Sequence, residues 1–89
     1  MKAIVTVIGK DRVGIISQVS AMLAEENVNV LDISQTVMRE YFTMIMLVDA
    51  SDIKSSFGDL AKRMAAFGDE SGLSIRIQRE DIFNAMHRI

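Results

Sequence analysis

Six segments with two different apolar periods constrain the fold of this chain more than any other feature of its sequence. Four of them are rich in β-branched residues or alternate apolar with polar side chains, which is typical of β-strands. They span residues 2–8, 29–40, 41–48 and 73–79. The other two repeat apolar side chains every three or four positions, which indicates amphipathic helices. They span residues 15–27 and 53–67.

The resulting order, strand, helix, strand, strand, helix, strand, predicts an α+β fold, the ferredoxin-like βαββαβ sandwich. In this arrangement a four-stranded antiparallel sheet has the strand order 4-1-3-2, and two helices cover one of its faces. The second and fourth strands are then the edges of the sheet. The first and third strands also carry apolar side chains on the other face, too many for open water. We expect the C-terminal helix or another subunit to cover part of that face.

Local signals refine the second helix and the second strand. The segment Asp49 to Asp52 offers several N-caps for the helix, and Gly68 and Gly72 are its stop signals. In the second strand, apolar side chains alternate with polar ones, so we expect one strand face to be buried. These apolar residues are Leu31, Ile33 and Val37. The seven methionines are assigned to core packing, their usual role.

The last residues predict a short helix that needs a partner surface. The length of 89 residues suits one domain, which we place at residues 1–80, followed by a helical tail at residues 81–89. One side of the tail carries Ile82, Phe83, Met86 and Ile89. A helix this short is unstable in isolation. We therefore expect the tail to be ordered and to bury Ile82, Phe83 and Met86, either on its own sheet or on a partner.

Composition excludes several classes of function. The net charge is −2 and no segment concentrates Lys or Arg, so nucleic acid is a poor candidate partner, despite Tyr41 and Phe42 on the third strand. The chain has no cysteine, which excludes disulfides and thiolate chemistry. The apolar run from Ala3 to Ile8 is far too short to cross a membrane. We expect a cytoplasmic protein with no membrane partner and no cofactor.

Catalysis and metal binding find no support in the sequence. An enzyme needs a base or a nucleophile beside a stabilising partner, and neither a Ser-His pair, a carboxylate pair nor a metal cluster can be assembled from these segments. The only histidine, His87, lies in the tail without a second ligand of a metal-binding pattern. We therefore expect a protein that is not an enzyme.

The stretch GKDRVGII, from Gly9 to Ile16, joins the first strand to the first helix. Glycine lets a ligand approach the backbone closely, and the free N–H groups at a helix start favour an anionic group such as a carboxylate. The simpler alternative is that Gly14 only permits a tight turn. The spacing matches neither the GxGxxG motif nor a P-loop.

The segment KDRVGII, followed by a helix and then by ENVNVLDISQ, resembles the signature of the ACT-domain family. In that family a D-x-x-G-[IVL] loop precedes a helix and an N-[IV]-x-[DS] strand, and the resemblance covers residues 2–80. The chain is most similar to the small stand-alone ACT proteins of bacteria. It also resembles the N-terminal modules of formyltetrahydrofolate deformylases and of glycine-cleavage regulators. Many ACT domains have proline before the glycine, where this chain has Val13.

The resemblance implies a homodimer with small-molecule sites at its interface, where the first loop of one subunit faces the start of the second strand of the other. By position, the ligand-binding residues would be Asp11, Arg12, Val13, Gly14, Ile15, Asn29, Val30 and Asp32. Arg12 would pair with a carboxylate and Asp32 with an amine, the two charges of an amino acid. The alternative for each is a solvated surface residue.

Two functional classes follow from these observations. The leading hypothesis is a regulatory module that binds an amino acid or a related metabolite at a homodimer interface. The alternative is a protein-interaction subunit with no small-molecule ligand. Gly14 and its charged neighbours favour the first hypothesis, and the apolar C-terminal tail favours the second.

Overall fold

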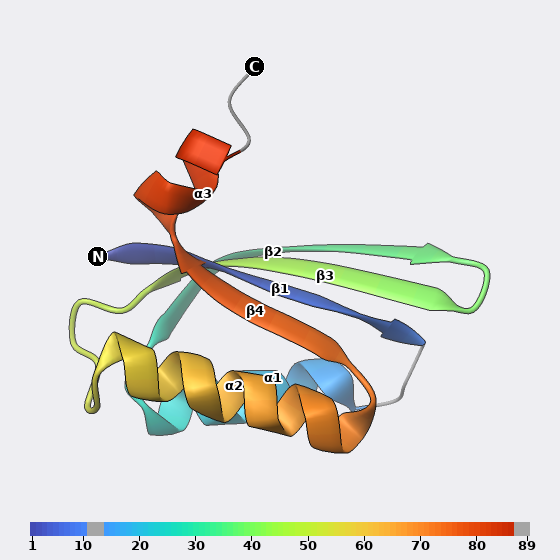
Figure 1. The fold of residues 1–89 in the computed structure, drawn as a ribbon, viewed down its shortest axis with the longest axis horizontal. Helices are drawn as coiled ribbons and strands as arrows, with labels where there is room; N and C mark the ends of the chain where they lie inside the picture. The colour runs from blue at the N-terminus through green and yellow to red at the C-terminus, as the bar shows by residue number, and fades with distance from the viewer. Residues whose placement is uncertain (11–13, 87–89) are drawn as a thin grey trace.

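The computed structural model describes residues 1–10 and 14–86 of the chain. Its elements follow the predicted order, with the predicted short helix at the end: β1 (Lys2–Lys10), α1 (Ile15–Glu25), β2 (Asn29–Met38), β3 (Tyr41–Asp49), α2 (Phe57–Ser71), β4 (Ser74–Arg79) and α3 (Glu80–Met86). The four strands form one antiparallel sheet in the order β2-β3-β1-β4 (Figure 1). The predicted ferredoxin-like fold and strand order are confirmed.

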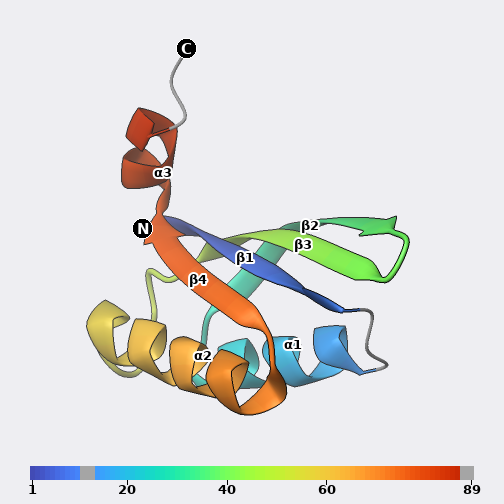
Figure 2. The ribbon, with the colours of Figure 1, turned by 45° about the vertical axis from the view of Figure 1, so that its right-hand side comes forward.

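Helices α1 and α2 cover one face of the sheet, and α3 rises from the end of β4 on the opposite side (Figures 1 and 2). We call the face that lacks α1 and α2 the open face. Because successive side chains of a strand point to opposite faces, every strand contributes to both. The position of α3 makes it the one described helix on the side of the open face.

The core lies between the sheet and the two large helices. On β1 and β3, alternate side chains are buried against the helices. The apolar side chains of α1 and α2 pack against them from the other side of the core. The largest of these buried side chains are Val5, Val7, Val19, Leu23, Met44, Met46, Val48, Leu60 and Met64. The predicted packing role of the methionines is therefore confirmed for Met44, Met46 and Met64, and it is wrong for Met38, which is 68% exposed. A strict period of two in the strands and of three to four in the helices produces this core.

Helix α2 starts later and ends later than the sequence signals predict. Its N-cap is Ser56, whose Oγ accepts a hydrogen bond from the Asp59 N–H at 3.0 Å. Asp49, one of the expected caps, is already engaged, because its carboxylate accepts hydrogen bonds from the N–H and the hydroxyl of Ser51. The helix ends at Gly72, which has a left-handed φ of 71°. Of the two predicted stop signals, Gly72 ends the helix and Gly68 does not.

Gly68 lies inside α2 for a packing reason. A Cβ at this position would stand 2.8 Å from the carbonyl oxygen of Leu73 and 3.2 Å from a side-chain carbon of Ile75. The helix therefore approaches β4 so closely that only glycine fits. The prediction that Gly68 ends the helix is wrong. Glycine is required at this position because the neighbouring strand lies too close for a side chain.

The predicted burial of one face of β2 is wrong for this chain. Leu31 and Val37 are 46% and 56% exposed, and Ile33 is also exposed. A β-bulge between Val30 and Asp32 first breaks the alternation of faces. Beyond the bulge, Ile33 and Val37 do point to the helix side, but β2 is an edge strand of the sheet, and the tip of the β2–β3 hairpin extends past the ends of α1 and α2 (Figures 1 and 2). The helices do not reach far enough to cover it.

The tail is helical, as predicted, but it does not bury its first apolar side chain. Ile82 is 48% exposed, whereas Phe83 is half-buried. Helix α3 begins at Glu80, immediately after β4 ends at Arg79, so no linker lets it fold back over the sheet. Residues 87–89, including His87 and Ile89, and the side chain of Met86 lie outside the described structure. None of the helices in the described part of the chain combines the length and the apolar character that a membrane span requires.

Candidate functional site

Gly14 is the N-cap of α1 and adopts a left-handed backbone conformation with a φ of 87°. No side chain from the described part of the chain caps this helix start, and the Gly14 carbonyl accepts the N–H of Gln18 at 3.0 Å. Among the described residues, no atom lies within 4 Å of the place where a Cβ would stand. The next residue, Ile15, is buried and anchors the helix in the core. The backbone at Gly14 is therefore held in position while its outer side stays open.

Three of the predicted ligand-binding residues, Asp11, Arg12 and Val13, lie outside the described residues. Their expected role therefore rests on the sequence alone. The described residues on either side of them, Lys10 at the end of β1 and Gly14 at the start of α1, lie at one end of the sheet (Figure 1). This is the end where the β2–β3 hairpin turns (Figure 1).

The other predicted residues, Asn29, Val30 and Asp32, lie at the start of β2. Their partners across the sheet are Asp49, Val48 and Leu47 on β3. Because the bulge adds one residue between Val30 and Asp32, Asn29 and Asp32 both lie on the open face, whereas Val30 points toward the helices. The carboxylate of Asp32 accepts a hydrogen bond from the N–H of Ile33 at 2.9 Å.

The structure does not bring the two halves of the predicted site together within one chain. The 11 residues of α1 separate Gly14 from the segment that leads into Asn29. With a rise of about 1.5 Å per residue, this helix alone is about 16 Å long. A small ligand cannot contact both ends at once in a single copy.

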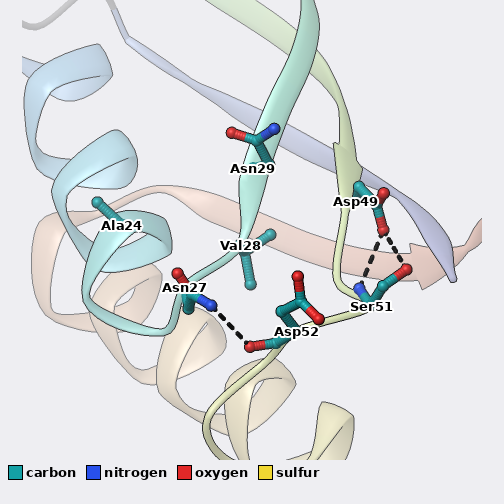
Figure 3. Close-up of a pocket in the computed structure, with 7 residues that line it drawn as sticks. All are labelled: Ala24, Asn27, Val28, Asn29, Asp49, Ser51 and Asp52. Atoms are coloured by element: carbon teal, nitrogen blue, oxygen red, sulfur yellow. Dashed lines mark hydrogen bonds between the residues drawn. The ribbon is translucent and has the colours of Figure 1, made fainter.

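A pocket of about 360 Å³ opens where α1 ends and β2 begins (Figure 3). Its walls come from the end of α1, the start of β2 and the turn after β3. The lining residues are Ala24, Asn27, Val28, Asn29, Asp49, Ser51 and Asp52. Only Asn29 is among the predicted site residues. The pairing of the second and third strands could have revealed Asp49, because this residue lies directly opposite Asn29.

Polar groups of the pocket are held by local hydrogen bonds. The side-chain amide of Asn27 donates to the carbonyl of Asp52 at 3.1 Å, which ties α1 to the turn after β3. Hydrogen bonds from the hydroxyl and the N–H of Ser51 lower the pKa of Asp49 below its usual value, and the terminal ammonium group at 3.7 Å adds to the effect. Asp49 is therefore a stable carboxylate. This chemistry suits a cationic or amide-bearing group.

Within the described residues, no group of three or more histidine, cysteine, aspartate or glutamate side chains could hold a metal ion. No polar or charged residue of that part of the chain is buried either. The polar and charged side chains of the described residues therefore reach the surface.

A family model of the ACT domain matches residues 2–78, and the chain belongs to the ACT-domain family. Its relatives include proteins named UPF0237. One from Clostridium acetobutylicum is 57% identical over the full length of both chains. Another, from Methanocaldococcus jannaschii, is 51% identical over 99% of this chain and 98% of the relative. The family therefore occurs in archaea as well as in bacteria.

Solved structures agree with this assignment. The ACT domain protein from Streptococcus pneumoniae is 49% identical and superposes with a TM-score of 0.81, covering 98% of each chain. A formyltetrahydrofolate deformylase from Pseudomonas putida superposes with a TM-score of 0.76 at 15% identity, and the match covers 88% of this chain but 28% of the deformylase. At that identity the similarity shows the fold alone. A glycine cleavage system transcriptional repressor shares it in the same way.

Proposed function

We propose that this ACT-family chain is a non-catalytic regulatory module that binds an amino acid or a related small metabolite at the interface of a homodimer. The ligand would contact Asp11, Arg12, Val13, Gly14 and Ile15 of one copy and Asn29, Val30 and Asp32 of the other. Membership in the ACT family and the open backbone at Gly14 support this proposal. A cytoplasmic location and a division into residues 1–80 and a tail at 81–89 belong to the same proposal.

The observation that carries the proposal is the register of the sheet. Lys10 at the end of β1 pairs with Tyr41, and Tyr41 pairs with Met38 at the end of β2. Lys10, at the end of β1, therefore lies at the opposite end of β2 from Asn29. An antiparallel pairing of β2 with its copy, centred between Ile33 and Ser34, would set Asn29 of one copy beside Met38 of the other. This pairing closes the edge of the sheet and joins the two halves of the site.

The first experiment is a thermal shift screen of the purified chain against the amino acids and folate derivatives. A ligand present at 100 times its dissociation constant stabilises a protein by about 2.7 kcal/mol, which raises the melting temperature of a small domain by about 10–20 °C. Calorimetry then measures the affinity of any ligand found. Light scattering on the same sample measures whether the chain is a dimer.

Two glycine substitutions provide the matched test. Gly14→Val should abolish ligand binding, because valine adds bulk and disfavours the left-handed conformation, while the dimer persists. Gly58→Ala, on the exposed side of α2, is the control and should leave binding unchanged. Full affinity in Gly14→Val or a monomeric wild type would contradict the interface site.

The alternative function, a protein-interaction subunit without a small-molecule ligand, is favoured by the exposed apolar tip of the β2–β3 hairpin. Val37, Met38 and Tyr41 are all more than half exposed. If no ligand shifts the melting temperature and the wild type is still a dimer, this alternative replaces the leading proposal.

A further inference from the structure

The pocket where α1 ends and β2 begins is formed by a single chain, unlike the interface site proposed above. Its three walls, the end of α1, the start of β2 and the turn after β3, belong to the same copy (Figure 3). Its volume of about 360 Å³ lies within the range of small-ligand pockets, which begins at about 300 Å³. It shares only Asn29 with the interface site and contains no residue of the loop that ends at Gly14. The pocket can therefore accept a ligand of its own.

Hydrogen bonds hold the walls of this pocket together without a ligand. Asn27, just past the end of α1, has a left-handed φ of 61°, and its side-chain amide donates to the carbonyl of Asp52 at 3.1 Å. The N–H of Lys54 donates to the carbonyl of Glu26 at 3.0 Å, a second link between the turn after β3 and the end of α1. A pocket formed in advance loses little conformational entropy when a ligand binds.

The electrostatics of the pocket favour a positively charged ligand. Asp49 and Asp52 line it, and none of the described residues in its walls is a lysine, arginine or histidine. The end of α1 borders the same space, and the C-terminal end of a helix carries the negative pole of its dipole. Two carboxylates and a helix end therefore act on the pocket with the same sign.

The two carboxylates of the pocket differ in how far they are compensated. Asp49 accepts two hydrogen bonds from Ser51, and the terminal ammonium group of Met1 lies 3.7 Å from its Oδ1. Lys2 also lies opposite Asp49, on β1. The carboxylate of Asp52 forms no ion pair or hydrogen bond with any described residue, and it points into the pocket (Figure 3). Asp52 is therefore the negative charge that still lacks a partner.

We propose that this pocket binds the cationic group of a small organic amine, with Asp52 as its counter-ion and Asn29 as a hydrogen-bonding partner. The side-chain amide of Asn29 makes no hydrogen bond with the described residues, so its oxygen is free to accept one. A primary ammonium group has three N–H donors and forms its strongest hydrogen bonds with carboxylates. The rim of the pocket already holds such a group, because the ammonium of Met1 donates to Ser51 Oγ at 2.7 Å.

The same walls argue against other ligands. The described residues offer no group of three or more side chains that could hold a metal ion. An anion, or the carboxylate of an amino acid, would lie beside Asp49 and Asp52 without a positive side chain to compensate it. The ligand class is therefore an amine that carries no carboxylate next to its ammonium group. This differs from the amino acid proposed for the interface site.

The first test compares three probes of equal chain length that differ in charge: butylammonium, butanol and butyrate. Each is titrated into the isotope-labelled chain near neutral pH and followed by two-dimensional NMR. Butylammonium should cause saturable shifts of the amide signals of residues 24–29 and 49–52, and the other two probes should not. Equal shifts with butanol, or no saturable shift with butylammonium, would overturn the proposal.

Matched variants test the residues. Asp52→Asn should weaken the binding of butylammonium about fivefold, which corresponds to the loss of one partly exposed ion pair. Asp69→Asn, the same change on the exposed side of α2, is the control and should keep the wild-type affinity. If Asp52→Asn fails to fold, Ala24→Leu repeats the test by filling the pocket, with Ala21→Leu on an exposed position of α1 as its control. Wild-type affinity in a folded pocket variant would overturn the proposal.

The interface site is distinguished by Gly14→Val. This variant should keep the wild-type affinity for butylammonium, because the pocket contains no residue of that loop. Loss of butylammonium binding in Gly14→Val would assign the NMR shifts to the interface site and overturn the proposal of a separate pocket. A monomeric wild type that still binds butylammonium would support the pocket and contradict the interface site alone.

Discussion

The two faces of this sheet carry similar side chains but meet different surroundings. On the face covered by α1 and α2, Val5 and Met46 are fully buried. On the open face, Ile8 and Ile45 of the same two strands are nearly half exposed. The apolar character of β1 and β3 is therefore a property of both faces, although the chain supplies helices for only one. In a single copy, apolar side chains on the open face stay in contact with water.

The largest expected effect compares one buried and one open position on the same strand. Met46→Ala should lower the free energy of unfolding by about 2–5 kcal/mol, since it leaves a cavity in the core. Ile45→Ala, its neighbour on the open face, should cost less than Met46→Ala in a dilute monomeric sample, because water already reaches its side chain. Urea denaturation at several protein concentrations measures both values. Equal losses in dilute solution would mean that the two faces do not differ as described.

A smaller effect distinguishes two glycines of α2. Gly68→Ala should destabilise the protein by about 1–3 kcal/mol, because the new Cβ would press against the backbone of Leu73. Gly58→Ala, where the nearest contact of a Cβ is an ordinary 3.9 Å, should instead stabilise it by about 0.5–1 kcal/mol through higher helix propensity. Thermal unfolding monitored by circular dichroism gives both shifts. A stabilising Gly68→Ala would show that the helix does not need to approach β4 so closely.

The smallest effect concerns acid stability at the polar end of the open face. Hydrogen bonds from Ser51 lower the pKa of Asp49 below the ordinary value of 3.8. A carboxyl group with a lower pKa in the folded state stabilises the protein above its unfolded pKa, and this stabilisation disappears as the pH falls below 3.8 through the folded pKa. Asp49→Asn should therefore remove a small part of the stability lost between pH 4 and pH 2, about the range of carboxyl titration. Because Asp49 is solvent-exposed, the change in the acid unfolding curve should be slight, and Asp69→Asn on α2 is the control.

Apolar runs and periods were enough to predict the strands and the two large helices, and the order of these elements predicted the strand order. Strand β4 shows its period directly, because Ile75 and Ile77 are buried against the helices and alternate with polar residues. Predictions were wrong where contacts outside its own local segment determine the role of a residue. Gly68 has the appearance of a helix stop, yet it lies within α2, and glycine is needed there because the backbone of Leu73 packs against it. Asp49 has the appearance of a cap, yet Ser51 already binds its carboxylate.

One part of the candidate site was indicated by the sequence, and another part was found only in the structure. The sequence alone indicated the Gly14 loop, and the structure adds the open left-handed backbone there. The pocket beside Asn29 was missed, apart from Asn29 itself, because Asn27, Asp49 and Asp52 come from segments that only the strand register brings together. Local pattern determines which residues can face a core or start a helix. Which surfaces stay uncovered, as on β2, the open face and α3, depends on where the helices end in space, and only the tertiary structure decides that.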